Sequence, residues 1–359
     1  MYFLQQMYLC FAPMDWITNC ATRLIVSEIF NKYWKSEDSL DLWTEFMNVD
    51  WFLINPHQVI KHALTTPWQK PILQIYWGKE ESLIKALEEI QNKYSELFSW
   101  IELNTWCPSN TVMKVGWWSD MLKDKEKTLN IIKKLSEISW KLPFSLKTRA
   151  WINEDDKVKQ LEFLVKASTY CDKITIHWRT LKQLYSWDSD WEFIYEVKNN
   201  IKKNWNSKCK IIGNWWITSY EDALDKNIKY NLDGIMIGQA AIWNPRIFTQ
   251  HLPSNKEKCD TVIKHLNYSI ACDQRFNEVI ACKSGNILIK DLEIPLKWIE
   301  EYCNKNDDNP KFQSHSIVEF RKFLFQYVKW IPWSKERKQE VLKCNYYDEL
   351  KGKIIEIFN

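Results

Sequence analysis

Two kinds of hydrophobic pattern follow one another along this chain. Up to about residue 250, short apolar runs of the length of buried strands alternate with segments whose apolar residues recur every three or four positions. After Pro253 only the second, helical pattern continues. We therefore predict alternating strands and helices over the first part of the chain and helices alone over the second.

Eight apolar runs in the first part are predicted strands. They cover residues 8–11, 43–47, 72–76, 99–103, 143–147, 173–176, 210–213 and 233–237. Segments 81–97 and 123–138 between them have one apolar face each, as helices do. Eight strands, each followed by a helix, predict an α/β fold, a (β/α)8 TIM barrel, over residues 1–250. A doubly wound sheet is the alternative, because one wrongly assigned strand would change the count.

The second part, residues 255–359, is predicted to be a smaller all-helical domain. In residues 314–329, the apolar side chains Ile317, Phe320, Leu324 and Tyr327 fall on one stripe of a helix. Residues 304–310, rich in Asn and Asp and ending in a proline, are predicted to form a loop.

Charge and cysteine content exclude several classes of protein. The net charge of the 359 residues is only +3, so a nucleic-acid partner must be argued from local features. Ten cysteines occur without a CxxC pair or zinc-like spacing, which is typical of a reduced compartment and argues against a metal site. No apolar run is long enough to span a bilayer, and the first residues lack a basic signal-peptide region. We expect a cytoplasmic protein without a membrane partner.

Tryptophan is unusually frequent and glycine unusually rare. The chain has 22 Trp and 7 Gly, whereas glycine ordinarily makes up about 7% of residues. Many of the tryptophans stand in turn contexts, such as Trp178 after His177 and the pair Trp215 and Trp216 after Asn214, where glycine is expected. We expect glycine at many of these positions in the native protein, as when UGA encodes glycine but is translated as tryptophan. A tryptophan-rich surface is the alternative, and Trp43 and Trp191 are candidates for genuine tryptophan.

Polar and reactive residues collect at the carboxyl ends of the predicted strands. In a TIM barrel the loops at these ends build the active site. The residues there include Gln74, Asn104, Cys107, Lys147, Arg149, His177, Arg179, Asn214, Gly238 and Gln239. Because stability alone does not favour one end of the barrel, we predict a single site at this mouth.

Read with glycine in place of tryptophan, seven segments resemble in order the motifs of the tRNA-dihydrouridine synthase family. They are residues 12–16, 102–109, 146–149, 177–180, 185–187, 213–217 and 237–240. The resemblance resumes in the helical part at 320–322 and 329–334. It implies an oxidoreductase that uses FMN and NADPH, or NADH, to reduce the C5–C6 bond of uridines in tRNA.

The resemblance also implies roles for individual residues. Cys107 would be the general acid that protonates C5 while hydride from reduced flavin reaches C6. Lys147 would hold negative charge at the flavin N1/O2 edge, and backbone N–H groups of 213–216 and 238–239 would bind the FMN phosphate. Gln239 departs from the arginine of many family members. The full set of expected cofactor contacts is Pro13, Met14, Asp15, Gln74, Lys147, His177, Asn214, Trp215, Trp216, Gly238 and Gln239.

The expected contacts to tRNA are Asn104, Arg149 and Arg179 at the barrel mouth and Arg321 and Lys322 in the helical domain. Residues 311–353 hold 10 Lys and Arg against 5 Asp and Glu. No protein partner is implied. Two alternatives stay open: an FMN barrel acting on a free pyrimidine, like dihydroorotate dehydrogenase, and an inactive RNA-binding protein if the tryptophans are genuine.

Overall fold

The computed structural model describes residues 7–34, 38–56, 64–66, 68–76, 79–105, 121, 124–150, 156–177, 191–204, 208–281, 294–307, 314–329 and 335–359. Their centre is a closed barrel of eight parallel strands, each hydrogen-bonded to its neighbours in sequence order, with β8 closing on β1. The predicted TIM barrel is therefore confirmed. The strands are β1 (Tyr8–Phe11), β2 (Ser39–Asn48), β3 (Ile72–Tyr76), β4 (Trp100–Asn104), β5 (Phe144–Arg149), β6 (Lys173–His177), β7 (Lys210–Asn214) and β8 (Gly234–Ile237).

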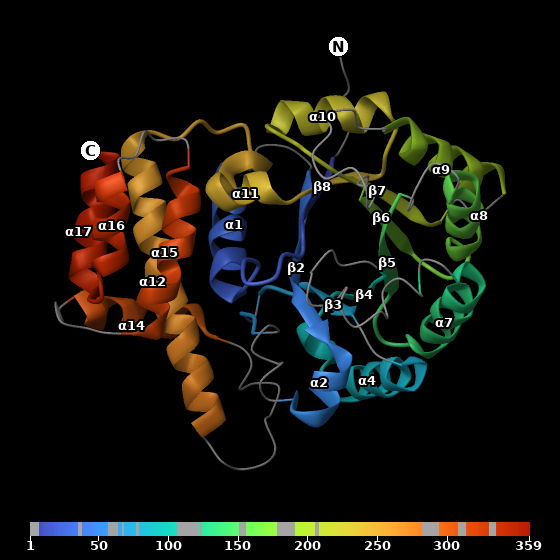
Figure 1. Ribbon diagram of the computed structural model, residues 1–359, viewed down its shortest axis with the longest axis horizontal. Helices are drawn as coiled ribbons and strands as arrows, with labels where there is room; N and C mark the ends of the chain where they lie inside the picture. Colours follow the sequence, from blue (N-terminus) through green and yellow to red (C-terminus); the bar gives the residue numbers. More distant parts are fainter. Residues whose placement is uncertain are drawn as a thin grey trace.

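A helix follows each strand and covers the outside of the barrel (Figure 1). These helices are α1 (Cys20–Tyr33), α2 (Val49–Ile54), α4 (Glu80–Lys93), α7 (Lys125–Ile138), α8 (Lys157–Ala167), α9 (Trp191–Lys203), α10 (Tyr220–Lys229) and α11 (Gln239–Trp243). Side-chain caps mark where several begin: Asn19 accepts from the Thr22 N–H at the start of α1, and Ser219 accepts from the Asp222 N–H at the start of α10. The predicted helix 81–97 was too long, because α4 ends at Lys93 and a separate 3-10 turn covers Ser95–Leu97.

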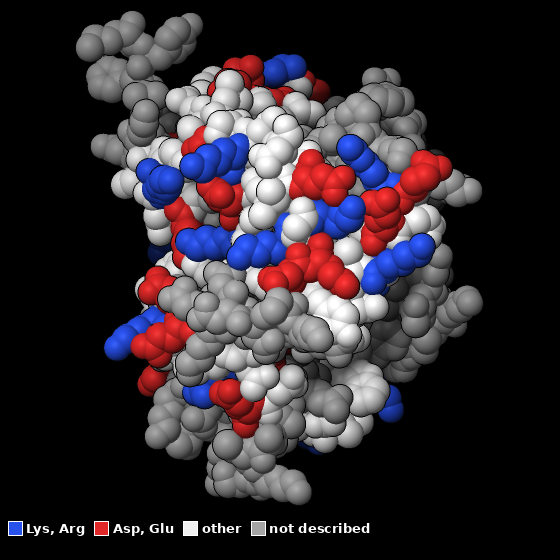
Figure 2. All heavy atoms as spheres, turned by 90° about the vertical axis from the view of Figure 1, so that its left-hand side faces the viewer, with Lys and Arg blue, Asp and Glu red and all other residues white. Residues whose placement is uncertain are grey.

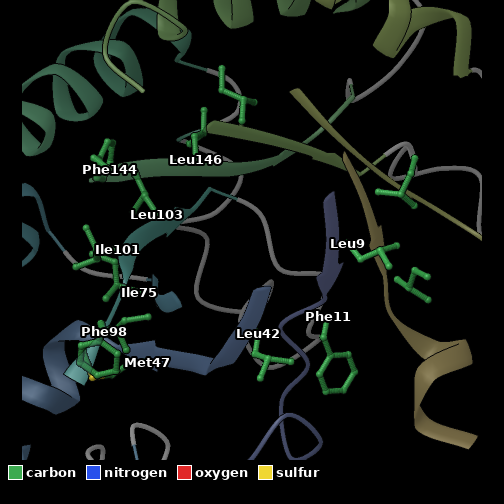
Figure 3. Packing of buried hydrophobic residues seen from close by; sticks show 14 of the residues in the cluster. Leu9, Phe11, Leu42, Met47, Ile75, Phe98, Ile101, Leu103, Phe144 and Leu146 are labelled. Carbon is green, nitrogen blue, oxygen red and sulfur yellow. The ribbon is translucent and has the colours of Figure 1, made fainter. Parts of the chain in front are cut away.

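Alternating side chains divide the barrel into an inner and an outer core. Leu9 and Phe11 of β1, with Ile101 and Leu103 of β4, point outward against the helices (Figure 3). Alternate residues of several strands point inward instead and form a small interior cluster. Its buried members are Cys10, Ala12, Trp43, Ile72, Ile212 and Met236. This period-two pattern decides which strand residues can reach a site inside the barrel.

Helices alone follow the barrel within the described residues, after the 3-10 turn Pro245–Phe248. They are α12 (Asn255–Ala281), α14 (Leu296–Asp307), α15 (His315–Tyr327), α16 (Lys335–Lys343) and α17 (Tyr347–Phe358). The predicted loop 304–310 is wrong in its first part, because α14 continues to Asp307. Local Asn and Asp content is a weak guide to where a helix ends.

The helical part packs closely against the barrel. Helix α12 runs along α1 (Figure 1), and Tyr268, Cys272 and Phe276 of α12 join the outer core of the barrel. A second core lies among α12, α15, α16 and α17. Apolar packing therefore continues from the barrel into the helices after residue 255. Within the described ranges, no helix combines the length and apolar character needed to cross a lipid bilayer.

Candidate active site

The carboxyl ends of β3, β4, β5 and β7 bring four of the predicted site residues together inside the barrel. Strand register pairs Asn104 with Lys147, and His177 with both Arg149 and Asn214. Gln74 lies one strand before Asn104 and is fully buried, while Asn104 is 6% exposed. The predicted grouping of polar side chains at one end of the barrel is present among these residues.

The buried carboxylate of Glu102 is hydrogen-bonded to Gln74 of this group. Gln74 Nε2 donates to Glu102 Oε1 at 2.6 Å, and Asn104 Nδ2 donates to Gln74 Oε1 at 3.0 Å. The indole N–H of Trp43 donates to the same Glu102 oxygen at 2.8 Å, and the Thr175 hydroxyl donates to Oε2 at 3.4 Å. These bonds connect four strands of the barrel across its interior.

Glu102 is fully buried, and burial raises the pKa of its carboxyl. The positive charges of Lys147 and Lys173 and the hydrogen bonds from Gln74 and Trp43 oppose this rise. Sequence reasoning assigned no role to Glu102. The signal was present, because Glu102 is two residues before Asn104 on the same strand and therefore faces the same interior.

Lys147 and Asn214 form the second half of the group. Lys147 Nζ donates to Asn214 Oδ1 at 3.1 Å, and Asn214 Nδ2 donates to the Met236 carbonyl at 2.9 Å. The amide of Asn214 is thereby oriented by β8, with its oxygen toward the lysine. The structure thus holds an ammonium group at a fixed position at the end of β5.

His177 and Arg149 lie beside this pair. The imidazole of His177 is 5.5 Å from the ring of Trp215, centroid to centroid. Arg149 is buried at 5% exposure, and its carbonyl accepts from Gln160 Nε2 at 3.0 Å. Trp216, the last residue of the predicted phosphate-binding segment 213–216, is 57% exposed.

The loop after β1 and the end of β8 approach each other closely. A Cβ at Gly238 would lie 3.6 Å from Ala12 Cβ and 3.7 Å from Met14 Sδ, and Gln239 is exposed. Pro13 is buried, and Asp15 is exposed. The next residue, Trp16, has φ 62° and is 60% exposed. An indole therefore occupies a left-handed backbone position that favours glycine.

The two predicted tRNA contacts of the helical part face different surroundings. Lys322 Nζ lies 5.5 Å from the Trp16 ring centroid, next to the barrel loop that contains Met14. Arg321 NH2 donates to the Cys344 carbonyl and to Asn345 Oδ1 within the helical part. The face of α16 and α17 shows positive and negative side chains interleaved (Figure 2), and Lys353 pairs there with Glu340 and Glu356. This face is not uniformly basic.

Two predicted site residues, Cys107 and Arg179, lie outside the described residues. Among the residues that are described, no group of three or more His, Cys, Asp or Glu side chains could hold a metal ion. The described cysteines Cys10, Cys20, Cys171, Cys209, Cys259, Cys272 and Cys344 are buried and unpaired.

Sequence reasoning also missed a charged cluster near the amino ends of the strands. Lys173 is fully buried, its Nζ donates to the Tyr8 hydroxyl, and it lies 3.3 Å from Asp41 Oδ2. Its ammonium lies 4.2 Å from the ring centroid of Trp100. The cluster closes the opposite end of the barrel with paired charges, which is consistent with a stabilising role.

Comparison with known proteins agrees with this geometry. The model of the dihydrouridine synthase (Dus) family matches residues 10–319. A tRNA-dihydrouridine(47) synthase [NAD(P)(+)] of Candida albicans is 28% identical over 235 residues, covering 60% of this chain and 38% of the relative. A probable tRNA-dihydrouridine synthase of Rickettsia conorii is 32% identical over 179 residues, covering 46% of this chain and 51% of the relative.

The chain spans between 27% and 38% of the length of the first three curated relatives. The family match nevertheless covers most of the chain, including β3, β4, β5 and β7, and it ends at residue 319, in the first part of α15. The protein belongs to the dihydrouridine synthase family.

Proposed function

We propose that this protein is a tRNA-dihydrouridine synthase that reduces the C5–C6 double bond of uridines in tRNA, with FMN as cofactor and NADPH or NADH as reductant. The observation that carries the proposal is the placement of two hydrogen-bonded pairs, Gln74 with Asn104 and Lys147 with Asn214, side by side in the strand register toward the carboxyl ends of the strands. Membership of the Dus family and relatives named for NAD(P) support it.

The donors at the barrel mouth fit the pyrimidine part of a flavin. That ring edge offers carbonyl oxygens and an imide N–H, and it gains negative charge on reduction. Lys147, held by Asn214, would stabilise this charge, while Gln74 and Asn104 would meet the polar ring edge. FMN, when bound, would supply hydride chemistry. The protein groups would hold the ring, exclude water and orient the uridine.

The phosphate of FMN is proposed to bind backbone N–H groups of 213–216 and of Gly238 and Gln239. The position of Gly238 beside Ala12 and Met14 of the loop after β1 supports this proposal, because Met14 is also a proposed FMN contact. His177, which lies between Arg149 and Asn214 in the strand register, and Arg149 are further candidates for contacts to FMN and tRNA. Pro13 and Asp15 in the loop after β1 complete the proposed surroundings.

Cys107 is proposed as the general acid that gives a proton to C5 of the uridine. It follows Asn104, the last residue of β4, by three positions in the sequence. A positioned acid is needed because negative charge develops at C5 as hydride reaches C6. Burial raises the pKa of Cys10, Cys171 and Cys209, which makes these three thiols poorer candidates.

The helical part, residues 255–359, is proposed to bind tRNA together with the mouth. Lys322 supports this role because it lies beside the loop after β1. Arg321 and Arg179 remain candidate contacts to tRNA. The mixed charge of the α16–α17 face favours binding along the side that carries Lys322.

Glycine is proposed at several tryptophan positions of the native protein, among them 16, 106, 178, 215 and 216. The positive φ of Trp16 supports glycine there, whereas the buried, hydrogen-bonded Trp43 fits its place as tryptophan. Tandem mass spectrometry of native protein is expected to show glycine at 106, 178, 215 and 216. Tryptophan at those positions would refute the reassignment.

The function is tested with protein that carries the residues found by mass spectrometry. Purified protein is expected to be yellow, to bleach with NADPH or NADH, and to form dihydrouridine in unmodified tRNA, measured by mass spectrometry of nucleosides. A free pyrimidine such as orotate should not be turned over. Colourless protein that binds tRNA would favour a binding role, and turnover of the free pyrimidine would favour the other enzyme class.

A further inference from the structure

Three side chains of neighbouring strands form a hydrogen-bonded chain from the barrel interior toward its mouth. Glu102 is fully buried, Gln74 is fully buried, and Asn104 is 6% exposed. The chain runs from Glu102 Oε1 to Gln74 Nε2 at 2.6 Å and from Gln74 Oε1 to Asn104 Nδ2 at 3.0 Å.

The bonds in this chain all run in one direction. The indole N–H of Trp43 can only donate, and it lies 2.8 Å from Glu102 Oε1, so this oxygen accepts. Gln74 turns its NH2 toward the same oxygen at 2.6 Å and its carbonyl oxygen away. That oxygen needs a donor from the next amide, so Asn104 turns its NH2 toward Gln74.

We propose that Glu102 is a positioning residue that sets the orientation of the Gln74 amide and, through it, of the Asn104 amide at the barrel mouth. With Nδ2 of Asn104 turned toward Gln74, the orientation of this amide at the mouth is fixed. The amide would meet the polar edge of a ring with carbonyl and imide N–H groups, which both uracil and the pyrimidine ring of a flavin carry. This inference rests on the proposed function, because that function places one or both of these rings at the mouth.

The test is a double-mutant cycle between Glu102→Leu and Gln74→Leu in the full-length protein. The parent must first bind FMN and form dihydrouridine, and its failure to do either would count against the proposed function instead. Two readouts separate the two rings: the Kd of FMN reports the flavin, and KM and kcat with unmodified tRNA report the uridine. Each single variant is expected to lose between about tenfold and about a hundredfold in at least one readout, which is the effect expected from losing one hydrogen bond to a charged group.

The double variant is expected to lose no more than the single variant with the larger loss, because both substitutions break the same chain of hydrogen bonds. Losses that multiply in the double variant would overturn the proposal, since the two residues would then act independently. Unchanged values in both readouts for Glu102→Leu would overturn it as well.

Two further variants separate orientation from general damage to the core. Glu102→Gln keeps an acceptor oxygen beside the Trp43 N–H and the Gln74 NH2, so it is expected to recover most of what Glu102→Leu loses. Thr175→Val removes the bond to the other carboxylate oxygen and leaves the Gln74 bond intact, so both readouts should stay at the parent values. Equal losses in Glu102→Gln and Glu102→Leu, or a tenfold loss in Thr175→Val, would contradict a role through Gln74.

Discussion

Replacing Trp16 by glycine tests whether this position is built for a residue without a side chain. Trp16 has φ 62°, is 60% exposed, and its ring has Lys322 Nζ 5.5 Å from the centroid. Trp140 is a matched control, because it is 66% exposed, lies outside the positive-φ region and has Lys141 Nζ 4.6 Å from its ring centroid. Both substitutions remove an exposed indole and one contact with a lysine.

The expected difference can be worked out from three contributions. A left-handed conformation costs a residue with a Cβ about 1–2 kcal/mol, and Trp16→Gly removes this cost. Glycine adds about 0.5–1 kcal/mol of conformational entropy to the unfolded chain in either variant. Each variant also loses a cation–π contact of about 0.5–1 kcal/mol. Trp16→Gly should therefore change the free energy of unfolding by less than about 1 kcal/mol, while Trp140→Gly should lose about 1–2 kcal/mol.

Trp43→Gly gives the opposite extreme. Its indole is fully buried and donates to Glu102, so removal should cost about 3–5 kcal/mol. All three variants are compared with the parent by urea denaturation followed by circular dichroism. If Trp16→Gly loses as much stability as Trp140→Gly, the backbone at residue 16 does not favour glycine and the reasoning is refuted.

Three further predictions concern catalysis, tRNA binding and pH. Cys107→Ala should keep bound FMN and its bleaching by NADPH but lose about 10²–10⁴-fold in dihydrouridine formation, and a parent-like rate would exclude Cys107 as the acid. Lys322→Ala should lower the slope of log Kd for tRNA against log salt by about 1, while the paired Lys353→Ala should leave it unchanged. Burial lowers the pKa of His265 to about 3, so the unfolded chain binds more protons below pH 6.5, and stability should fall by up to about 1.4 kcal/mol per pH unit from there toward pH 3. His265→Gln should flatten this dependence in acid denaturation, and an unchanged slope would exclude His265 as its source.

The sequence was sufficient to predict the barrel because its strands are short, apolar and evenly spaced. Predicted strands 8–11 and 72–76 match β1 and β3 at both ends. Strand β2 is longer than predicted and begins at Ser39, because its first residues pair with β1 although their side chains are partly polar. Backbone pairing with a neighbour, which local hydrophobicity does not report, extended it.

The predicted site residues were chosen by their place at strand ends, and this criterion has a clear limit. It identifies side chains at the mouth, such as Lys147 and Asn214, whose contact is present in the structure. It does not identify residues one layer deeper. Glu102 accepts hydrogen bonds from Trp43 and Gln74, which lie on two other strands, and such contacts depend on strand register and not on the local sequence.

The described tryptophans differ by location, and this bears on how a recombinant chain should behave. Trp43 and Trp191 are buried in the core, whereas Trp16 and Trp216 are exposed, at a left-handed turn and in the proposed phosphate loop respectively. Exposed indoles cost the fold little, because no packed neighbour has to move. At the barrel mouth, however, these indoles occupy space beside the main chain that a bound phosphate would need. A chain made with tryptophan at these positions should therefore lose affinity for FMN well before it loses its barrel.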